Sequence, residues 1–279
     1  MEIIDYTVKT EREMKIRDYL SARLGFSTSL IAKVKVGGVF LNGINVHMRA
    51  TVKDGDRIEI HLPSEKSENI PPISMPLDIL FEDEWLLVIS KPRNMPVHPS
   101  KGNSLPTLAN GVMAYMGEDF VFRAVNRLDR DTSGIVIIAK NQLCAAKMSR
   151  QVRRGDLKKT YLAIVEGVTE EHGIIDAPIE RECEGSIKRV VREDGKPSVT
   201  EYRLLRNMGE CSLVKINLIT GRTHQIRVHM SYIGHPLCGD FLYGNKNEKD
   251  TYRLHCAEIS FSHPIKGELM TLKSKADFI

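Results

Sequence analysis

The sequence predicts an α+β protein in which a small N-terminal α/β domain precedes a larger domain, built on a mixed, largely antiparallel sheet flanked by helices. Predicted strands outnumber predicted helices and often follow one another directly, whereas a doubly wound fold would alternate them. The run PSEKSENIPPISMP at 63–76 has the proline and polar content of a linker, because proline cannot donate ladder hydrogen bonds. The expected domains are therefore 12–62 and 77–279, joined by the linker 63–76.

Composition places the chain among globular proteins with real cores, since 42% of its 279 residues are hydrophobic. No apolar run approaches the roughly 20 residues of a membrane-spanning helix, and the first residues lack the apolar core of a signal peptide. The five cysteines form no C-x-x-C pair, so neither a disulfide framework nor a zinc knuckle is indicated. We therefore expect a cytoplasmic protein without membrane association.

The expected N-terminal domain begins with two helical patterns. Apolar side chains recur at helical spacing from Ile16 to Leu24. A second helix can start at Ser27, a common N-cap residue, and the glycine pair at 37–38 ends it. The Asn-Gly pair at 42–43 then lies between two short apolar runs, which predicts a hairpin because this pair tolerates the positive φ angles of a tight turn.

The larger domain shows both strand and helix patterns. The continuous apolar run 135–139 is short enough for a buried strand, and the alternation of apolar and polar residues in 211–220 predicts a strand with one dry face. Further strands are expected at 79–81, 85–89, 161–165 and 199–205, and helices at 107–116, at 143–154 and after a cap at Thr223.

Positive charge is concentrated locally, although the net charge is only +4. Six basic residues and one acid fall between Lys147 and Lys159. Clustered Lys and Arg can neutralise nucleic-acid phosphates, yet a charge run by itself is more often a solvated helix face. A nucleic-acid partner therefore needs support from other motifs.

The densest polar segment is NRLDRDTSG at 126–134, directly before the expected buried strand. Such a loop between core elements is a common position for functional side chains, but its spacing alone fits an ordinary turn equally well. His224 and His229 are five residues apart and fall on different helix faces, so a zinc site is not indicated. The chain contains neither a phosphate-binding loop motif nor a dinucleotide fingerprint, and we expect no cofactor and no metal.

The same nine residues closely resemble the H-R-L-D-x-x-T-S-G signature of RluA-type RNA pseudouridine synthases. The resemblance continues in ILFEDEWLLVISKPRNMPVHP, KKTYLAIVEG and GRTHQIRVHMSYIGHPLCGD, so that it covers most of residues 77–243. Asn126 stands where the family usually has histidine, whereas the aspartate is intact. The resemblance implies an enzyme that isomerises specific uridines in structured RNA to pseudouridine.

The resemblance also implies roles for single residues. Asp129 is the expected catalytic aspartate, and Arg227 is expected to keep it charged, since a buried carboxyl group tends to hold its proton. Tyr161 is expected to stack on the target base and to assist proton removal late in the reaction, and Arg127 is expected to fill the space left when the base is extruded. Arg222 is assigned to RNA phosphate or to structure. The residues leave open whether Asp129 forms a covalent intermediate or abstracts a proton from the sugar.

Residues 14–62 resemble, in the order of their elements, the S-four domain, a small RNA-binding domain named after a ribosomal protein. This resemblance implies RNA contact by the second helix, which carries Lys33 and Lys35, and by Arg17 on the helix before it.

The leading hypothesis is therefore a pseudouridine synthase that acts as a monomer on large-subunit ribosomal RNA, with transfer RNA as the alternative substrate. A non-catalytic RNA-binding or ribosome-assembly factor that retains the fold is a second hypothesis. A protein-binding module is a third, and it explains neither the basic clusters nor the aspartate loop.

Overall fold

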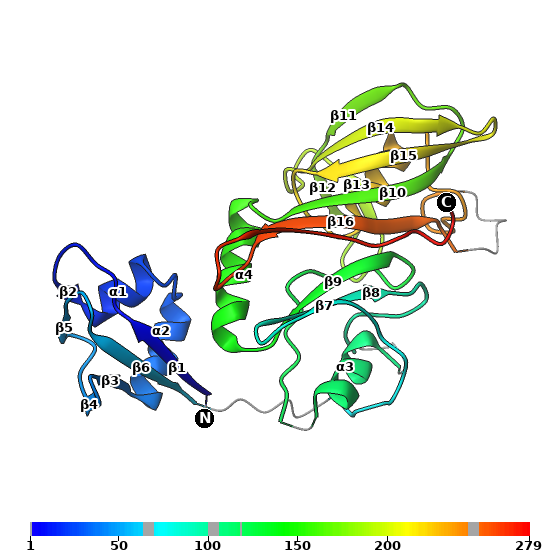
Figure 1. The fold of residues 1–279 in the computed structure, drawn as a ribbon. Coiled ribbons are helices and arrows are strands. Elements are labelled where there is room, and N and C mark those ends of the chain that lie inside the picture. The colour runs from blue at the N-terminus through cyan, green and yellow to red at the C-terminus, as the bar shows by residue number, and fades with distance from the viewer. Residues whose placement is uncertain (1, 64–69, 100–105, 118, 245–250) are drawn as a thin grey trace.

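The computed structural model describes residues 2–63, 70–99, 106–117, 119–244 and 251–279. It has the predicted α+β organisation, with a small sheet and two helices at the N-terminus and a larger unit built on a mixed, largely antiparallel sheet (Figure 1). Each unit has its own cluster of buried hydrophobic side chains. The fold class expected from the sequence is therefore confirmed.

The N-terminal unit is a four-stranded sheet, in the described part of the chain, covered by two helices. Its sheet order is β1-β6-β3-β4, and a short pair, β2 with β5, lies outside it. The elements are β1 (Glu2–Thr7), β2 (Met14–Lys15), α1 (Ile16–Ala22), α2 (Thr28–Gly37), β3 (Val39–Leu41), β4 (Ile44–Asn45), β5 (Thr51–Val52) and β6 (Arg57–Leu62). β1 lies before residue 12, where the domain was expected to start. The strand was not predicted, because its partner β6 is remote in the sequence and no turn residues mark the pairing.

Local signals in this unit act as expected. Ser27 accepts a hydrogen bond from the Leu30 amide (3.2 Å) and so caps α2. Asn42 and Gly43 have φ angles of 51° and 83°, the left-handed conformations that a tight hairpin turn between β3 and β4 requires.

The larger unit is organised around one long sheet. In the described residues it has nine strands in the order β11-β14-β15-β10-β16-β9-β8-β7, with β17 paired to β16 beside this path. Its strands are β7 (Asp78–Glu82), β8 (Leu86–Lys91), β9 (Ser133–Ala139), β10 (Lys158–Glu166), β11 (His172–Asp176), β14 (Val199–Asn207), β15 (Cys211–Leu218), β16 (Leu254–Ser262) and β17 (Leu269–Lys273). A separate hairpin consists of β12 (Ile179–Arg181) and β13 (Arg189–Val191), and the helices are α3 (Leu108–Met116), α4 (Gln142–Arg154) and α5 (Gln225–Tyr232).

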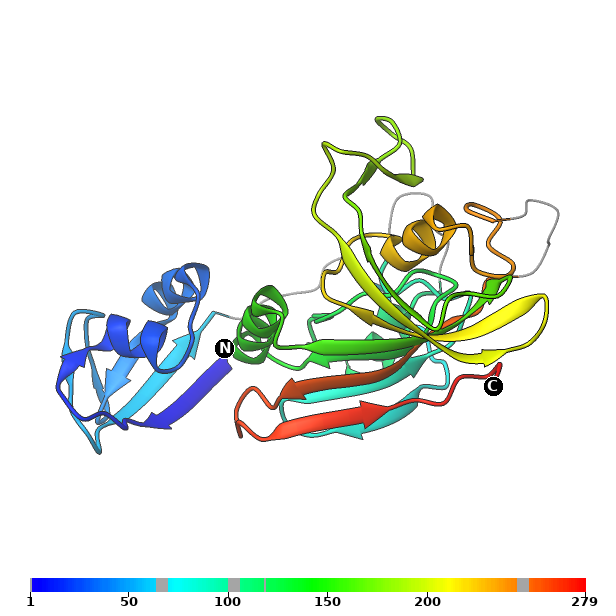
Figure 2. The same cartoon turned by 90° about the horizontal axis from the view of Figure 1, so that it is seen from above.

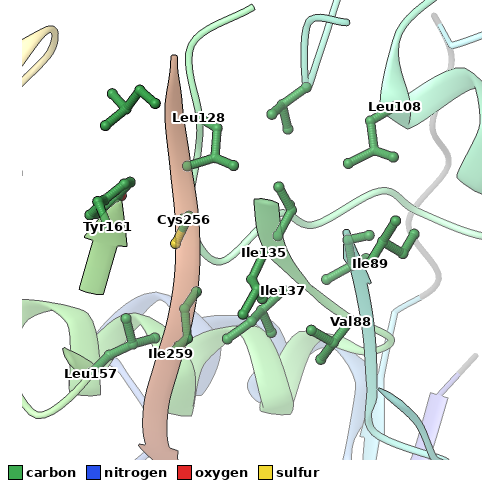
Figure 3. Packing of buried hydrophobic residues seen from close by; sticks show 14 of the residues in the cluster. Val88, Ile89, Leu108, Leu128, Ile135, Ile137, Leu157, Tyr161, Cys256 and Ile259 are labelled. Carbon is green, nitrogen blue, oxygen red and sulfur yellow. The ribbon is translucent and has the colours of Figure 1, made fainter. Parts of the chain in front are cut away.

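β16 joins the two halves of the sheet. It pairs antiparallel with β10 and parallel with β9, so strands far apart in the sequence become neighbours. Figure 3 shows Cys256 of β16 between Tyr161 of β10 and Ile135 of β9. Gly134 makes this approach possible, since a Cβ at that position would lie 2.3 Å from the Cys256 carbonyl oxygen. β16 was not expected from the sequence, although it lies at the centre of the sheet.

The expected linker divides into two parts. Residues 64–69 lie outside the described residues. The described residues that follow pack on the larger unit, because Ile70 is buried in its core and the Ile73 amide donates to the Asn110 carbonyl of α3 (3.1 Å). Asn110 also donates to the Pro71 carbonyl (2.7 Å). This segment is thus anchored rather than a free tether.

The two units touch through α4, which lies beside the N-terminal sheet and helices in both views (Figures 1 and 2). Leu143 of α4 is fully buried and belongs to the hydrophobic cluster of the N-terminal unit. Lys33 of α2 donates to the Gln142 side chain of α4 (3.0 Å). Within the described residues, no helix is long and apolar enough to cross a membrane.

Candidate active site

Two adjoining cavities, of about 840 and 360 Å³, meet at the loop that carries Asp129. The loop runs from an isolated β-bridge at Ala124 to the start of β9. α5 and the β12–β13 hairpin lie together on one side of the large sheet (Figure 2). Arginine side chains line the larger cavity in excess over acids: they are Arg123, Arg127, Arg130, Arg181, Arg189 and Arg227. A polyanionic substrate is therefore favoured over a neutral one.

Asn126 fixes the start of the loop. Its amide nitrogen donates to the Ile135 carbonyl (2.9 Å), and its amide oxygen accepts from the Ile137 amide (2.9 Å). Both bonds are buried and hold the loop against β9, the strand that directly follows it. Asn126, which stands where the family usually has histidine, thus has a structural role in this chain.

Lys91 fixes the end of the loop. Its ammonium group is almost fully buried and donates to the carbonyls of Pro92 (2.8 Å) and Arg130 (3.0 Å). Burial lowers the pKa of Lys91 to about 7, and the nearby carboxylates of Asp131 and Asp129 oppose that shift. The carboxylate of Asp129 is thereby presented from a loop that is held at both ends.

Arg227 connects Asp129 to a second carboxylate. Its Nε and Nη2 donate to the two oxygens of Asp240 (2.6 and 2.8 Å), and its Nη1 lies 3.6 Å from Asp129 Oδ2. The guanidinium stacks between the rings of Tyr243 and Tyr252, 4.8 and 4.4 Å from their centroids. Although burial opposes it, the Asp240 hydrogen bonds raise the pKa of Arg227, so this cation is permanent.

The Asp129 carboxylate is less buried than the sequence analysis assumed. Its side chain is 30% exposed to the cavity, whereas that of Arg227 is 5% exposed. Arg227 therefore fixes and orients a carboxylate that faces solvent or substrate, instead of rescuing a fully buried charge.

Tyr161 lies in β10 on the floor of the smaller cavity and is 4% exposed. Burial raises the pKa of its phenol, with a further increase from Cys256 and Asp129. The ring can thus serve as an apolar platform, whereas a phenolate that accepts a proton is disfavoured.

The remaining expected site residues divide between two places. Arg127 is exposed and borders both cavities, and Arg222 is exposed at the mouth of the smaller one, where its Nε donates to the Pro197 carbonyl (3.2 Å). The expected cap at Thr223 is wrong, because His224 is the N-cap of α5 and the Gln225 side chain accepts from the Arg222 amide. The basic residues of the N-terminal unit lie elsewhere: Arg17 and Lys35 are exposed, and Lys33 lines a groove between α2 and α4.

Four residues that complete the site were not expected from the sequence: Lys91, Asp240, Tyr243 and Tyr252. Asp240 closes the matched segment GRTHQIRVHMSYIGHPLCGD, so its place at the end of a family motif was an available signal. Lys91 likewise lies inside the matched segment ILFEDEWLLVISKPRNMPVHP, whereas Tyr243 and Tyr252 carry no local signal, because only the fold brings them to the loop. Among the described residues, no group of three or more His, Cys, Asp or Glu side chains is arranged to hold a metal ion.

Known proteins of similar sequence and fold indicate the family of this chain. The family model described as RNA pseudouridylate synthase matches residues 85–232. The uncharacterized RNA pseudouridine synthase YjbO of Bacillus subtilis is 39% identical over 92% of this chain and 93% of its own. Ribosomal large subunit pseudouridine synthase D of Pasteurella multocida is 38% identical over 83% of this chain and 78% of its own. Among solved structures, human RNA Pseudouridylate Synthase Domain Containing 1 superposes with a TM-score of 0.63 at 27% identity, over 75% of this chain and 87% of that one.

The fold and the matches define the class, which is an isomerase that modifies RNA. The chain belongs to the RluA-like family of RNA pseudouridine synthases. The family match begins at residue 85, so it does not extend to the N-terminal unit.

Proposed function

We propose that the enzyme converts specific uridines of large-subunit ribosomal RNA to pseudouridine, with Asp129 as the catalytic residue. The observation that carries the assignment of Asp129 is its position: a partly exposed carboxylate at the junction of two arginine-lined cavities, 3.6 Å from the buried guanidinium of Arg227.

Asp129 must be ionised to break and re-form the glycosidic bond. Attack on the sugar or base and abstraction of a sugar proton both start from the charged carboxylate. Arg227 favours that form and keeps its direction, because Asp240 and two stacked rings leave the guanidinium little freedom. The bidentate bond of Arg227 is made to Asp240. Asp129 therefore stays reactive, since a bidentate bond to Asp129 would occupy both of its carboxylate oxygens.

A uracil that is flipped out of the RNA requires a surface on which to stack, and the space that it leaves in the RNA requires a side chain to fill it. Tyr161 supplies an apolar ring on the cavity floor, which fits stacking against the uracil. Arg127 is exposed beside Asp129, which fits insertion into the space of the flipped nucleotide.

The N-terminal unit, which comprises the expected range 12–62 together with β1, acts as an S-four-like RNA-binding domain. Arg17 and Lys35 present exposed charges, and Lys33 lines the groove that Arg123 and Arg153 of the larger unit also line. Because Arg123 borders the larger active-site cavity as well, one basic path extends from Asp129 to α2. Arg222 contributes a phosphate contact at the cavity mouth. The protein acts as a monomer, and all the residues that line this path belong to one chain.

Ribosomal RNA is favoured as the substrate over transfer RNA by the names of several relatives. Three proteins called ribosomal large subunit pseudouridine synthase D are 33 to 38% identical to this chain. They come from Xanthomonas campestris, Pasteurella multocida and Haemophilus ducreyi.

The test is pseudouridine mapping on total RNA from cells that lack this gene, treated with wild-type protein or with Asp129→Asn. We expect new sites in large-subunit ribosomal RNA with wild type only. Sites confined to transfer RNA would overturn the substrate, and activity of Asp129→Asn would overturn the catalytic assignment. No new site with folded protein would favour a non-catalytic assembly factor.

A further inference from the structure

His224 has an unusual backbone conformation at the edge of the active site. Its φ and ψ angles are 58° and 15°, in the left-handed region, and it forms the N-cap of α5 without a side-chain capping bond. This region is uncommon for residues that carry a Cβ, and such residues gather at functional sites. The conformation turns the imidazole into both cavities, where it lies beside Asp129.

The hydrogen bonds around His224 determine which ring nitrogen carries the proton. The Tyr243 hydroxyl oxygen accepts from the Arg189 backbone amide (2.9 Å) and lies 2.7 Å from His224 Nδ1. Burial raises the pKa of Tyr243 to about 12, so its hydroxyl keeps its proton. Nδ1 is the acceptor beside that hydroxyl proton, so we assign the tautomer in which the hydroxyl donates to a bare Nδ1 and the ring proton resides on Nε2.

That nitrogen lies close to Asp129. Nε2 lies 3.8 Å from Asp129 Oδ2, the same oxygen that Arg227 Nη1 approaches at 3.6 Å. Two donors, one at the N-cap of α5 and one three residues later in its first turn, therefore converge on one carboxylate oxygen. A small closing movement would convert both approaches into hydrogen bonds and leave the other oxygen, Oδ1, for the nucleoside.

The charges around His224 favour its neutral form. Burial lowers its pKa, Asp129 and Asp240 oppose this, and Arg227 and Arg189 add to it. A charged ring would also carry a proton on Nδ1, directed at the hydroxyl proton of Tyr243. The neutral ring instead satisfies every donor in the chain from the Arg189 amide through Tyr243 to Asp129.

We propose that His224 is a positioning residue for Asp129: as a neutral Nε2–H donor, with its tautomer set by Tyr243, it holds Oδ2 together with Arg227 and leaves Oδ1 to the substrate. This inference rests on the proposed catalytic role of Asp129.

Two variants of the full chain separate the donor from the backbone. His224→Asn suits the left-handed backbone, because Asn tolerates it, but has no donor at the Nε2 position. His224→Gln carries an amide nitrogen near the Nε2 position. With total RNA from gene-deleted cells and enzyme in excess, we expect His224→Asn to lower the single-turnover rate about tenfold to a hundredfold, the range of one hydrogen bond to a charged group. The enzyme concentration at half-maximal rate should change little, and His224→Gln should recover most of the rate.

Asp129→Asn in the same assay distinguishes this inference from the proposed function. An active Asp129→Asn variant would overturn the function itself. An inactive Asp129→Asn variant beside a fully active His224→Asn variant would overturn only the positioning role. Equal losses in the Asn and Gln variants would overturn it as well, because the Nε2 donor would then not matter.

The tautomer can be measured without relying on either variant. In protein labelled with ¹⁵N-histidine, the His224 ring should show a protonated Nε2 and a bare Nδ1 at pH 7, and the opposite pattern would overturn the proposal. Tyr243→Phe removes the donor to Nδ1, which should raise the pKa of His224 and shift the acid limb of the rate profile to higher pH. A purely structural role of His224 predicts no such shift.

Discussion

At the residue scale, Asn126 holds the loop that carries Asp129 through two buried hydrogen bonds to β9. Asn126→Ala removes both partners and leaves a buried carbonyl and a buried amide unpaired, so it should lower the free energy of unfolding by about 2 to 4 kcal/mol. Urea unfolding measures this loss. The exposed Asn45 is the matched control, where replacement by alanine should change stability by less than about 0.5 kcal/mol. Similar losses of stability in the two variants would contradict the proposed role of the two Asn126 hydrogen bonds.

Lys91 gives the protein a pH-dependent stability. Its pKa falls from 10.5 to about 7 on folding, because burial disfavours the charged form. Between these values the unfolded chain binds the proton and the folded chain does not, so the contribution of Lys91 to stability rises with pH across this window. It is lost as the pH falls through about 7.

The matched comparison is wild type against Lys91→Met, which keeps the length of the side chain without a titratable group. The free energy of unfolding of wild type minus that of Lys91→Met should increase from pH 7 to pH 10 in denaturant titrations. A difference independent of pH would show that Lys91 titrates normally in the folded protein.

At the scale of elements, the junction of β9 with β16 depends on Gly134. Its φ is 107°, and a Cβ there would meet the backbone of Cys256 at 2.3 Å. Gly134→Ala should therefore cost more than about 3 kcal/mol of stability, from backbone strain together with the clash. The TSG end of the family signature thus has a packing reason.

Gly117, at the end of α3, isolates the strain from the clash. Its φ is 94°, yet nothing lies within 4 Å of a Cβ built there. Gly117→Ala should cost only the strain, about 1 to 3 kcal/mol. Thermal unfolding of both variants gives the comparison, and a larger loss at Gly117 would refute the role of the close approach.

At the scale of the whole molecule, the proposed RNA path joins the two units. Each phosphate contact contributes a slope of about 0.7 to 0.9 to the fall of log affinity with log salt. The double variant Arg17→Ala, Lys35→Ala should therefore reduce that slope by about 1.5 for the RNA substrate. The rate at saturating enzyme should be unchanged, since both residues lie outside the two active-site cavities.

Lys273 of β17 offers the matched control for this measurement. It is 75% exposed and lies on the larger unit, outside the active-site cavities. Lys273→Ala should leave the salt slope intact in filter-binding or anisotropy titrations. An equal reduction in both proteins would mean that the N-terminal unit has no special part in binding.

Local chemistry was enough to predict many elements. The Asn-Gly turn at 42–43, the Ser27 cap and the buried run 135–139 are confirmed because each depends on residues adjacent in the sequence. The start of α5 was wrong for the converse reason. Its first turn is organised by Gln225 and by the left-handed His224, not by the Thr223 hydroxyl.

The sequence by itself determined the α+β class, the family and the loop that carries Asp129, because a motif and a hydrophobic period are local properties of the chain. Only the tertiary structure decided that β16 crosses the centre of the sheet, that Arg227 is bound chiefly to Asp240, and that Lys91, Tyr243 and Tyr252 surround the loop. These contacts join residues remote in the sequence, and their pairing follows from how nine strands share one sheet in the described chain. A pattern in the sequence indicates which side chains are buried, but only the fold shows which partners they meet.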